Sequence, residues 1–291
     1  MSSFDSPNDQ ASGLRQMVQS PKKKKPLRVI AVTSGKGGVG KTNLTANLAI
    51  VAARAGRRVL IIDADLGLAN TEIILGVQPH HHIGELCDGI RTLSEVLTPA
   101  PHGISLLSAG GRLNNLGSEQ QLRLLTELEE MENRFDFVLI DSGAGLGADV
   151  RFFVGAAQEA ILVVSPEPTS LADAYAAVKT LSSQVTRFHV VVNPAADDSA
   201  ARGVFDKLTQ VTGKFLKAEV GYLGCIPHDH NLKRAVMWQR PLVDLFPSSP
   251  ASEAVRTLYH QLEWRGPQAA PHGGLKFLWQ QLLRDSMETK R

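Results

Sequence analysis

Residues 35–42 form a glycine-rich octet, Gly-Lys-Gly-Gly-Val-Gly-Lys-Thr, between two apolar segments. The octet satisfies the phosphate-binding pattern G-x-x-x-x-G-K-[ST]. An apolar, β-branched run over 28–33 precedes it, and an apolar segment with a helical pattern over 42–55 follows it. Because strand, loop and helix in this order are the context in which the pattern binds phosphate, the octet predicts a nucleotide-binding α/β domain.

The residues of the octet have different expected roles in binding ATP or ADP. Glycines allow successive backbone N–H groups to point at an anion, and the N-terminus of the following helix adds the positive end of its dipole. We expect Lys41 to reach the β- and γ-phosphates and the Thr42 hydroxyl to bind Mg²⁺. The expected nucleotide contacts are Gly35, Gly37, Gly38, Val39, Gly40, Lys41, Thr42 and Asn43.

Short apolar segments alternate with helical patterns through most of the chain. The sequence predicts strands at 28–33, 58–63, 104–108, 136–141, 160–165, 187–193 and 221–226, and helices at 42–55, 118–132, 169–183 and 199–216. Several of these strands are almost continuously apolar, which is typical of a parallel sheet covered on both faces. The pattern therefore predicts a doubly wound α/β fold with a mostly parallel sheet. Thr169 or Ser170, with Asp173, predicts a capping box on the third helix.

Composition suggests four parts: an extension over 1–26 that ends in a lysine-rich linker, a nucleotide-binding domain over 27–265, a linker over 266–274 and an amphipathic helix over 275–291. The net charge of +2 does not favour direct DNA binding, and the two cysteines lack metal-ligand spacing. The N-terminus is polar and no apolar run approaches the ~20 residues that span a bilayer, so we expect a cytoplasmic protein.

Carboxylates follow two of the predicted strands. Asp63 and Asp65 end the strand over 58–63, and Asp141 ends the strand over 136–141. Ligands of open parallel sheets bind beyond the carboxyl ends of the strands, so these side chains should face the octet. We expect Asp141 to hold Mg²⁺ through a water, with a strand-end helix cap as the alternative, and Asp65 to lie near the metal and orient the attacking water. Asp63 is expected to be structural, bonding to the loop that follows it, with direct catalysis as the alternative.

Residues 36–42 resemble the deviant Walker A motif of the MinD/ParA family of ATPases. In that family the early lysine, here Lys36, reaches across an ATP-sandwiched dimer to the partner's nucleotide. The resemblance covers about residues 27–265 and implies slow, Mg²⁺-dependent hydrolysis of ATP and homodimerisation on ATP. It also implies that the catalytic residues are Lys36, Lys41 and Asp65.

Three segments resemble the regulators of flagellar number and placement within this family. They are residues 63–70, residues 141–145 (Asp-Ser-Gly-Ala-Gly, where MinD has Asp-Ser-Pro-Ala-Gly) and residues 9–15. The last is similar to an activator motif, D-Q-A-x-x-L-R, that stimulates the signal-recognition-type GTPase FlhF, and a polar tail without a partner is the alternative. The resemblance also implies a FleQ-type transcription activator and flagellar C-ring proteins as partners. Its implied FlhF contacts are Asp9, Gln10, Ala11, Leu14 and Arg15.

The ends of the last two predicted strands resemble the segments that line adenine in MinD-like proteins. Asn193, Pro227 and Asp229 are the residues implied, and ordinary strand-end turns are the alternative. Two histidine groups, 80–82 and 228–230, lack the spacing of metal ligands on a helix face, and we interpret them as a solvated loop and a strand-end turn.

The segment over 275–291 carries an apolar stripe at helical spacing, formed by Leu275, Leu278, Trp279, Leu282 and Leu283, with Phe277 beside it. It resembles the membrane-targeting helix of the MinD family. That resemblance implies that two such helices in an ATP dimer bind anionic lipid by avidity at the inner face of the cytoplasmic membrane, at the cell pole. Packing on its own domain or on a partner protein is the alternative.

Three other functions remain open. A MinD-type regulator of the division site would not need residues 9–15, and a ParA-type DNA-segregation ATPase would need a basic dimer surface but no terminal amphipathic helix. An interaction module with an inert phosphate-binding loop would not need Lys41, Thr42, Asp65 and Asp141 together.

Overall fold

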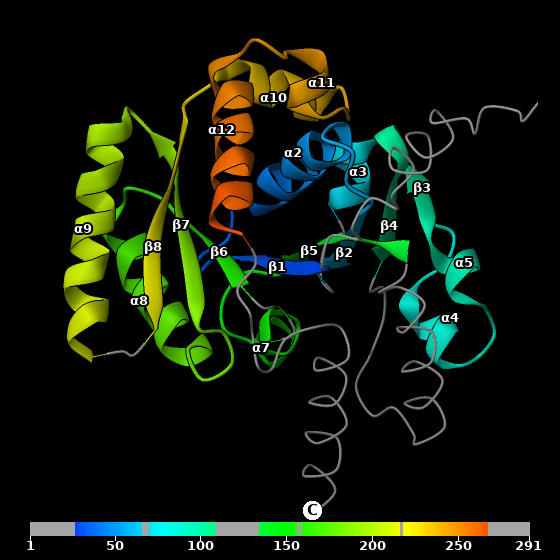
Figure 1. Cartoon of the computed structure of the whole chain (residues 1–291), viewed down its shortest axis with the longest axis horizontal. Helices are drawn as coiled ribbons and strands as arrows, with labels where there is room; N and C mark the ends of the chain where they lie inside the picture. The colour runs from blue at the N-terminus through cyan, green and yellow to red at the C-terminus, as the bar shows by residue number, and fades with distance from the viewer. Residues whose placement is uncertain are drawn as a thin grey trace, which may run out of the picture.

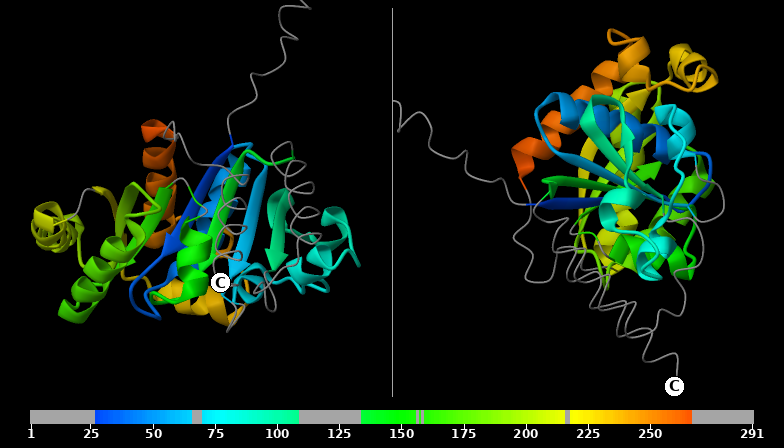
Figure 2. Two further views of the ribbon diagram at one scale, coloured as in Figure 1. Left: turned by 90° about the horizontal axis from the view of Figure 1, so that it is seen from below. Right: turned by 90° about the vertical axis from the view of Figure 1, so that its right-hand side faces the viewer.

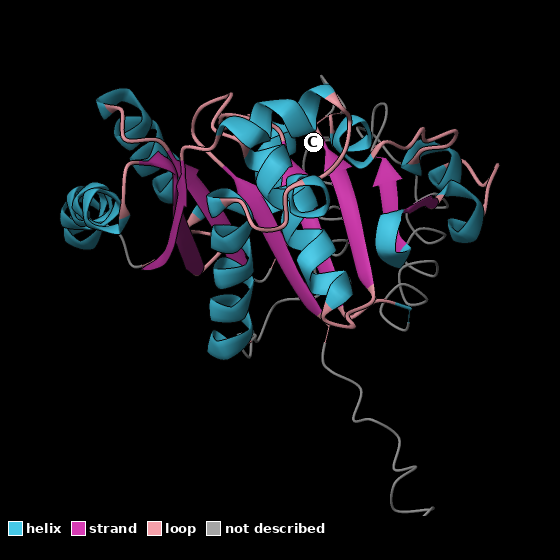
Figure 3. Cartoon of the chain, turned by 90° about the horizontal axis from the view of Figure 1, so that it is seen from above, coloured by secondary structure: helices cyan, strands magenta, loops and turns pink. Residues whose placement is uncertain are grey.

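The computed structural model describes residues 27–65, 70–108, 134–155, 157, 159–215 and 218–266. Its centre is an eight-stranded sheet with the order β3-β4-β2-β5-β1-β6-β7-β8 (Figure 1). All neighbouring strands pair in parallel except β3, which is antiparallel to β4. The parallel strands, drawn in magenta in Figure 3, point in one direction. The strands are β1 (Arg28–Thr33), β2 (Val59–Ala64), β3 (Thr98–Ala100), β4 (Ile104–Ser108), β5 (Phe137–Ser142), β6 (Glu159–Val164), β7 (Arg187–Ala195) and β8 (Glu219–Pro227).

Helices cover both faces of the sheet (Figure 2). One layer contains α2 (Lys41–Arg54), α3 (Thr71–Leu75), α10 (His230–Met237), α11 (Leu242–Leu245) and α12 (Pro250–Arg265). The other contains α4 (Ile83–Cys87), α5 (Leu93–Val96), α7 (Ala148–Gly155), α8 (Pro168–Leu181) and α9 (Asp198–Phe215). A short 3-10 turn, Pro101–Gly103, joins β3 to β4.

The two layers explain why the strands are almost continuously apolar. Successive side chains of a strand point to opposite faces, so Val29 and Ala31 of β1 enter one core, while Ile30 and Val32 enter the other. A strand with helices on both sides therefore needs an apolar residue at every position. The fold is doubly wound, as the alternation of strands and helices predicts.

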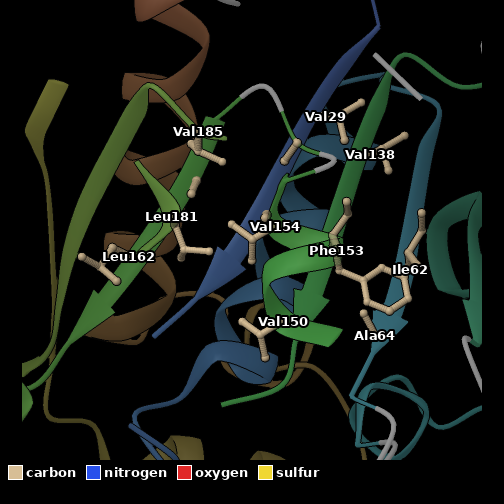
Figure 4. Packing of buried hydrophobic residues seen from close by; sticks show 14 of the residues in the cluster. Val29, Ile62, Ala64, Val138, Val150, Phe153, Val154, Leu162, Leu181 and Val185 are labelled. Carbon is tan, nitrogen blue, oxygen red and sulfur yellow. The ribbon is translucent and has the colours of Figure 1, made fainter. Parts of the chain in front are cut away.

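Helix α7 shows how the second layer is attached. Val150, Phe153 and Val154 recur at i, i+3 and i+4, and all three are buried against the sheet. In Figure 4 the Phe153 ring lies next to Ile62 and Ala64 of β2. Because α7 follows β5, this packing fixes the loop that carries residues 143–147 over the carboxyl end of the sheet.

A buried ion pair joins Arg28 of β1 to Glu159 of β6. Arg28 Nε and Nη2 donate to the two Glu159 carboxylate oxygens, each at 2.9 Å, and Arg28 Nη1 donates to the Leu262 carbonyl at 2.6 Å. His189 Nε2 lies 2.5 Å from Glu159 Oε2. Burial alone would raise the pKa of Glu159, but the hydrogen bonds from His189 and Arg28 outweigh it and lower that pKa to about 2.

All the predicted strands are present, with ends shifted by no more than two residues, as are the predicted helices at α2, α8 and α9. The predicted capping box on α8 is wrong. This helix begins at Pro168 with Glu167 as its N-cap, and the Ser170 hydroxyl instead accepts a hydrogen bond from the Ser165 N–H at 2.9 Å.

Several predicted features lie outside the described residues: the FlhF contacts within 9–15, the helix over 118–132 and the amphipathic helix over 275–291. In the part of the chain that the structure describes, no helix is both long and apolar enough to cross a bilayer.

Candidate nucleotide-binding site

The glycine-rich loop joins the end of β1 to the start of α2. Gly38 and Gly40 have φ angles of 75° and 91°, a left-handed conformation that favours glycine. Gly40 is the N-cap of α2, so Lys41 is the first residue of the helix. The first N–H groups of a helix have no partner within it, and they form an anion site together with the loop.

Two glycines of the loop are also required by close packing. A Cβ atom on Gly35 would lie 2.3 Å from the backbone carbonyl of Asp173 in α8, and a Cβ atom on Gly40 would lie 2.4 Å from Asn193 Nδ2. The same Asn193 nitrogen donates to the Val39 carbonyl at 2.7 Å. Asn193, which the sequence predicts beside the base, therefore supports the phosphate-binding loop in this structure.

The predicted carboxylates meet at the carboxyl end of the sheet. Asp63 of β2 and Asp141 of β5 are paired in register, and both are buried. The two oxygens of Asp63 accept hydrogen bonds from the N–H groups of Asp65 and Thr71, each at 3.2 Å. These bonds confirm that Asp63 bonds to the segment that follows it, as predicted.

Asp141 accepts hydrogen bonds from three threonines. Thr45 and Thr71 donate their hydroxyls to its two oxygens, at 3.2 Å and 3.1 Å, and the Thr42 side chain contributes a third hydrogen bond. Burial, and then the charge of Asp63, raise the pKa of Asp141 to about 7 against these hydrogen bonds. A cation at this position would stabilise the carboxylate form.

Lys41 and Asp65 complete the group. Lys41 is 8% exposed, and this burial lowers its pKa. The negative charges of Asp141 and Asp65 act in the opposite direction, which shows that both carboxylates lie near the lysine. A Cβ atom on Gly143 would lie 3.7 Å from Asp65 Oδ1, which places that carboxylate against the loop after β5. The structure thus brings together Lys41, Thr42, Asp65 and Asp141, as the sequence predicts.

Lys36 has a partly exposed side chain, whereas Val39 and Lys41 of the same octet are buried. Its Nζ atom forms an ion pair with Glu167, the N-cap residue of α8. The side chains of the pair are 41% and 60% exposed. No pattern in the sequence indicates Glu167 as a site residue.

The segment after β8 is hydrogen-bonded to the N-terminal ends of α10 and α12. Asp229 is the N-cap of α10, and its oxygens accept hydrogen bonds from the N–H groups of Asn231 at 2.9 Å and Ala251 at 3.2 Å. Burial would raise the pKa of Asp229, but these and other hydrogen bonds lower it. Pro227 ends β8, His228 and Asp229 connect the strand to α10, and His230, predicted as part of a strand-end turn, is the first residue of that helix. The contacts of Pro227 and Asp229 with adenine stay a prediction.

The first histidine group lies in a loop, as the sequence predicts: residues 77–82 form neither helix nor strand, and His80 and His82 are exposed. His82 is the N-cap of α4, and its N–H donates to Glu85 Oε2 at 3.0 Å. His81 Nδ1 lies 3.0 Å from the same oxygen. The end of this loop therefore caps the N-terminus of α4, which begins at Ile83.

The model of the CobQ/CobB/MinD/ParA nucleotide binding domain matches residues 30–242. Among curated relatives, the antiactivator FleN of Pseudomonas aeruginosa is 40% identical over 265 residues, which are 89% of this chain and 94% of the relative. The flagellum site-determining protein YlxH of Helicobacter pylori is 32% identical over 291 residues, which are 95% and 99% of the two chains.

Solved structures with the same fold include MinD proteins. The MinC:MinD cell division complex of Aquifex aeolicus matches with a TM-score of 0.66 and 29% identity, over 85% of this chain and all of that one. The septum site-determining protein MinD of Pyrococcus horikoshii, complexed with Mg-ADP, matches with a TM-score of 0.63 and 25% identity, over 81% and 95% of the two chains.

Proposed function

The chain belongs to the MinD/ParA family of nucleotide-binding ATPases, in its FlhG/FleN group, and we propose that it is a dimerising ATPase switch that regulates flagellar number and placement. The observation that carries the proposal is the 40% identity to an antiactivator over nearly the whole of both chains. The geometry supports a working ATPase, because Lys41, Thr42, Asp65 and Asp141 converge on the glycine-rich loop.

The residues at the site fit ATP and Mg²⁺. Left-handed glycines and a helix N-terminus offer N–H donors to the phosphates, and the carboxylate and hydroxyl oxygens are those that Mg²⁺ prefers. When bound, Mg·ATP supplies the phosphoryl group that is transferred to water. Lys41 would neutralise phosphate charge, Thr42 would bind the metal, and Asp141 would hold it through a water.

Asp65 would orient the attacking water. Its carboxylate faces Gly143 in the loop after β5, where an added Cβ atom would lie 3.7 Å from Asp65 Oδ1. Phosphoryl transfer to water is limited mainly by positioning and by charge, and a carboxylate held in this way provides both.

Lys36 would act in the dimer. In the single chain it is held by Glu167, close to the solvent. We propose that it leaves this partner to contact the nucleotide of a second copy, which makes dimerisation depend on ATP. Hydrolysis would then release the dimer.

The regulatory output would depend on segments outside the described residues. We propose that residues 9–15 stimulate the GTPase FlhF, with Gln10 and Arg15 as the important side chains. The printed name of the Pseudomonas relative, an antiactivator, supports a FleQ-type transcription activator as a partner. The name of the Helicobacter relative supports a role in the site of the flagellum. We further propose contacts with C-ring proteins and, through residues 275–291, with anionic lipid at the inner face of the cytoplasmic membrane.

The rival functions receive less support. The flagellar relatives match 89% and 95% of this chain, whereas the MinD of Synechocystis matches 74%. A ParA-type role in DNA segregation rests on solved structures that are 19% identical to this chain or less. Similarity at that level supports the shared fold but not a shared function.

The deciding experiment measures GTP hydrolysis by FlhF of the same organism with the full chain and with its Gln10→Ala variant. We expect stimulation by the natural chain and its loss in the variant, while the variant still hydrolyses ATP. Equal stimulation by both would remove residues 9–15 from the mechanism. Absence of stimulation, with an FlhF shown to be active, would leave an ATPase of this family with another target.

A further inference from the structure

Helix α10 and the turn after it expose a run of cationic and apolar side chains. This basic–apolar surface consists of Lys233, Arg234, Val236, Met237, Trp238 and Arg240, all exposed. Met237 is 80% exposed and Trp238 is 56% exposed. Large apolar side chains that lie together on a surface mark interaction sites more often than isolated ones do.

The basic–apolar surface is held in one conformation by its aromatic rings. Trp238 stacks on Phe246, with ring centroids 6.1 Å apart. The Arg234 guanidinium lies 5.5 Å from the Trp238 ring centre and 4.8 Å from that of Phe246. A cation in contact with two rings is attracted to both, so the three side chains stabilise one another.

The backbone of the turn is fixed as well. Gln239 has a φ of 52°, and its N–H donates to the Val236 carbonyl, while the Arg240 N–H donates to the Ala235 carbonyl. These two bonds form a Schellman motif, in which glycine is the usual residue at the left-handed position. A Cβ atom on Gly76, after α3, would lie 2.9 Å from the Gln239 carbonyl oxygen, so α3 packs directly against this turn.

The charged side chains of α10 and of the turn after it have one sign. Residues 230–240 contain Lys233, Arg234 and Arg240 but no aspartate or glutamate. Ile73 on α3, the helix that packs against α10, adds a further apolar side chain that is 42% exposed. The complement of this surface is a segment that carries both carboxylates and bulky apolar side chains.

We propose that the basic–apolar surface docks an acidic, amphipathic segment of a partner protein. A protein segment fits better than a lipid surface because Trp238 is stacked rather than free to insert and because α10 has only eight residues. Tryptophan, methionine and arginine are also the residues enriched in the cores of protein interfaces, where rigid anchors lose little entropy on binding. This inference does not depend on the flagellar role.

In Figure 1, α10 and α11 lie on the outer side of the helix layer that contains α2 and α12. The surface is thus carried by a different part of the fold from Trp264, an 88%-exposed tryptophan in the last turn of α12. Trp264 therefore provides a matched control for loss of an exposed indole. Arg202 provides the control for the arginine, since its guanidinium lies 4.7 Å from the Tyr222 ring centre.

The test measures fluorescence anisotropy of a labelled synthetic helical peptide of about 16 residues, with glutamates on one face and leucines on the other, titrated with the full chain. We expect binding that weakens as salt is added, because the attraction is partly electrostatic. Trp238→Ala and Arg234→Gln should each weaken binding by about tenfold or more, as is typical of interface anchors. Trp264→Ala and Arg202→Gln should leave it unchanged, and circular dichroism checks that all four variants are folded.

Several outcomes would overturn the proposal. One is an affinity that Trp238→Ala does not change, and another is equal binding of a peptide with lysines in place of the glutamates. Flotation with phosphatidylglycerol-containing vesicles that requires Trp238, without peptide binding, would assign the surface to lipid. Self-association that requires Trp238 would assign it to a second copy. Peptide binding that appears only after deletion of residues 267–291 would assign it to the chain's own C-terminal segment.

Discussion

Lys36 and Glu167 form an ion pair between the glycine-rich loop and the N-cap of α8, 131 residues further along the chain. The pair holds the lysine against its own chain. Because both side chains are substantially exposed, the pair contributes no more than about 1 kcal/mol. It is therefore weak enough to be exchanged for the phosphate contact that we propose for Lys36 in a dimer.

The first prediction concerns the release of Lys36. Glu167→Gln removes the competing carboxylate, so dimerisation with a non-hydrolysable ATP analogue should strengthen, by no more than about fivefold. Analytical ultracentrifugation across protein concentrations measures the dissociation constant. The reciprocal variant, Lys36→Ala, should bind the analogue as a monomer. A normal dimer from Lys36→Ala, or a weaker one from Glu167→Gln, would contradict the exchange.

The second prediction concerns Asp65. Asp65→Ala should bind ATP but hydrolyse it at least about a hundredfold more slowly, because the attacking water loses the carboxylate that orients it. The variant should therefore accumulate as an ATP dimer, measured by gel filtration after incubation with ATP. Asp206→Ala, on the exposed face of α9, is the control and should hydrolyse ATP normally. A monomeric Asp65→Ala in ATP, or one that keeps its activity, would remove the role proposed for Asp65.

The core of the site could be predicted from sequence because its signals are local. The octet defines its own loop, and the apolar strands before Asp63 and Asp141 place both carboxylates at one edge of a parallel sheet. The partners of Asp141 could not be predicted in the same way. Thr71 precedes it by 70 residues, and only the packed fold brings that hydroxyl to the carboxylate.

Short helices gave no signal for a related reason. Helix α3 has five residues and α5 has four, which is too few for an apolar period to recur. The sequence locates Asn193 and Asp229 near the ends of β7 and β8, but their hydrogen bonds to Val39 and to the start of α12 depend on residues far away in the chain. The local sequence pattern thus predicts where a residue lies along the chain's strands, whereas its hydrogen-bond partners depend on how distant segments pack together.

The third prediction tests the contact between the loop and α8. Gly35→Ala adds a Cβ atom 2.3 Å from the Asp173 backbone, and the backbone cannot move aside as a flexible side chain can. The variant should lose about 1–3 kcal/mol of unfolding free energy, measured by urea denaturation, and bind nucleotide more weakly. Gly147→Ala is the matched control, since among the described residues no atom lies within 4 Å of its added Cβ. Equal stability of the two variants would mean that the loop does not pack on α8 in solution.

The fourth prediction concerns the buried pair of Arg28 and Glu159. The pKa of Glu159 is lowered from 4.5 to about 2, so the carboxylate stabilises the folded chain at pH values above its unfolded pKa. That contribution, about 3 kcal/mol, should be lost as the pH falls from near 4.5 through about 2, because the folded chain resists taking up the proton that the unfolded chain binds.

The difference in unfolding free energy between the natural chain and Glu159→Gln isolates this effect from other titrating groups. At pH 7 the variant should be less stable by about 3–5 kcal/mol, because Arg28 stays buried without its counter-charge. Denaturation curves measured at several pH values should show the difference shrinking below pH 4.5. Glu219→Gln is the control: Glu219, on β8, forms an exposed ion pair with Arg187 of β7. Its loss should change the unfolding free energy by less than about 1 kcal/mol. A constant difference at all pH values would mean that the lost stability comes from packing rather than from the charge of Glu159.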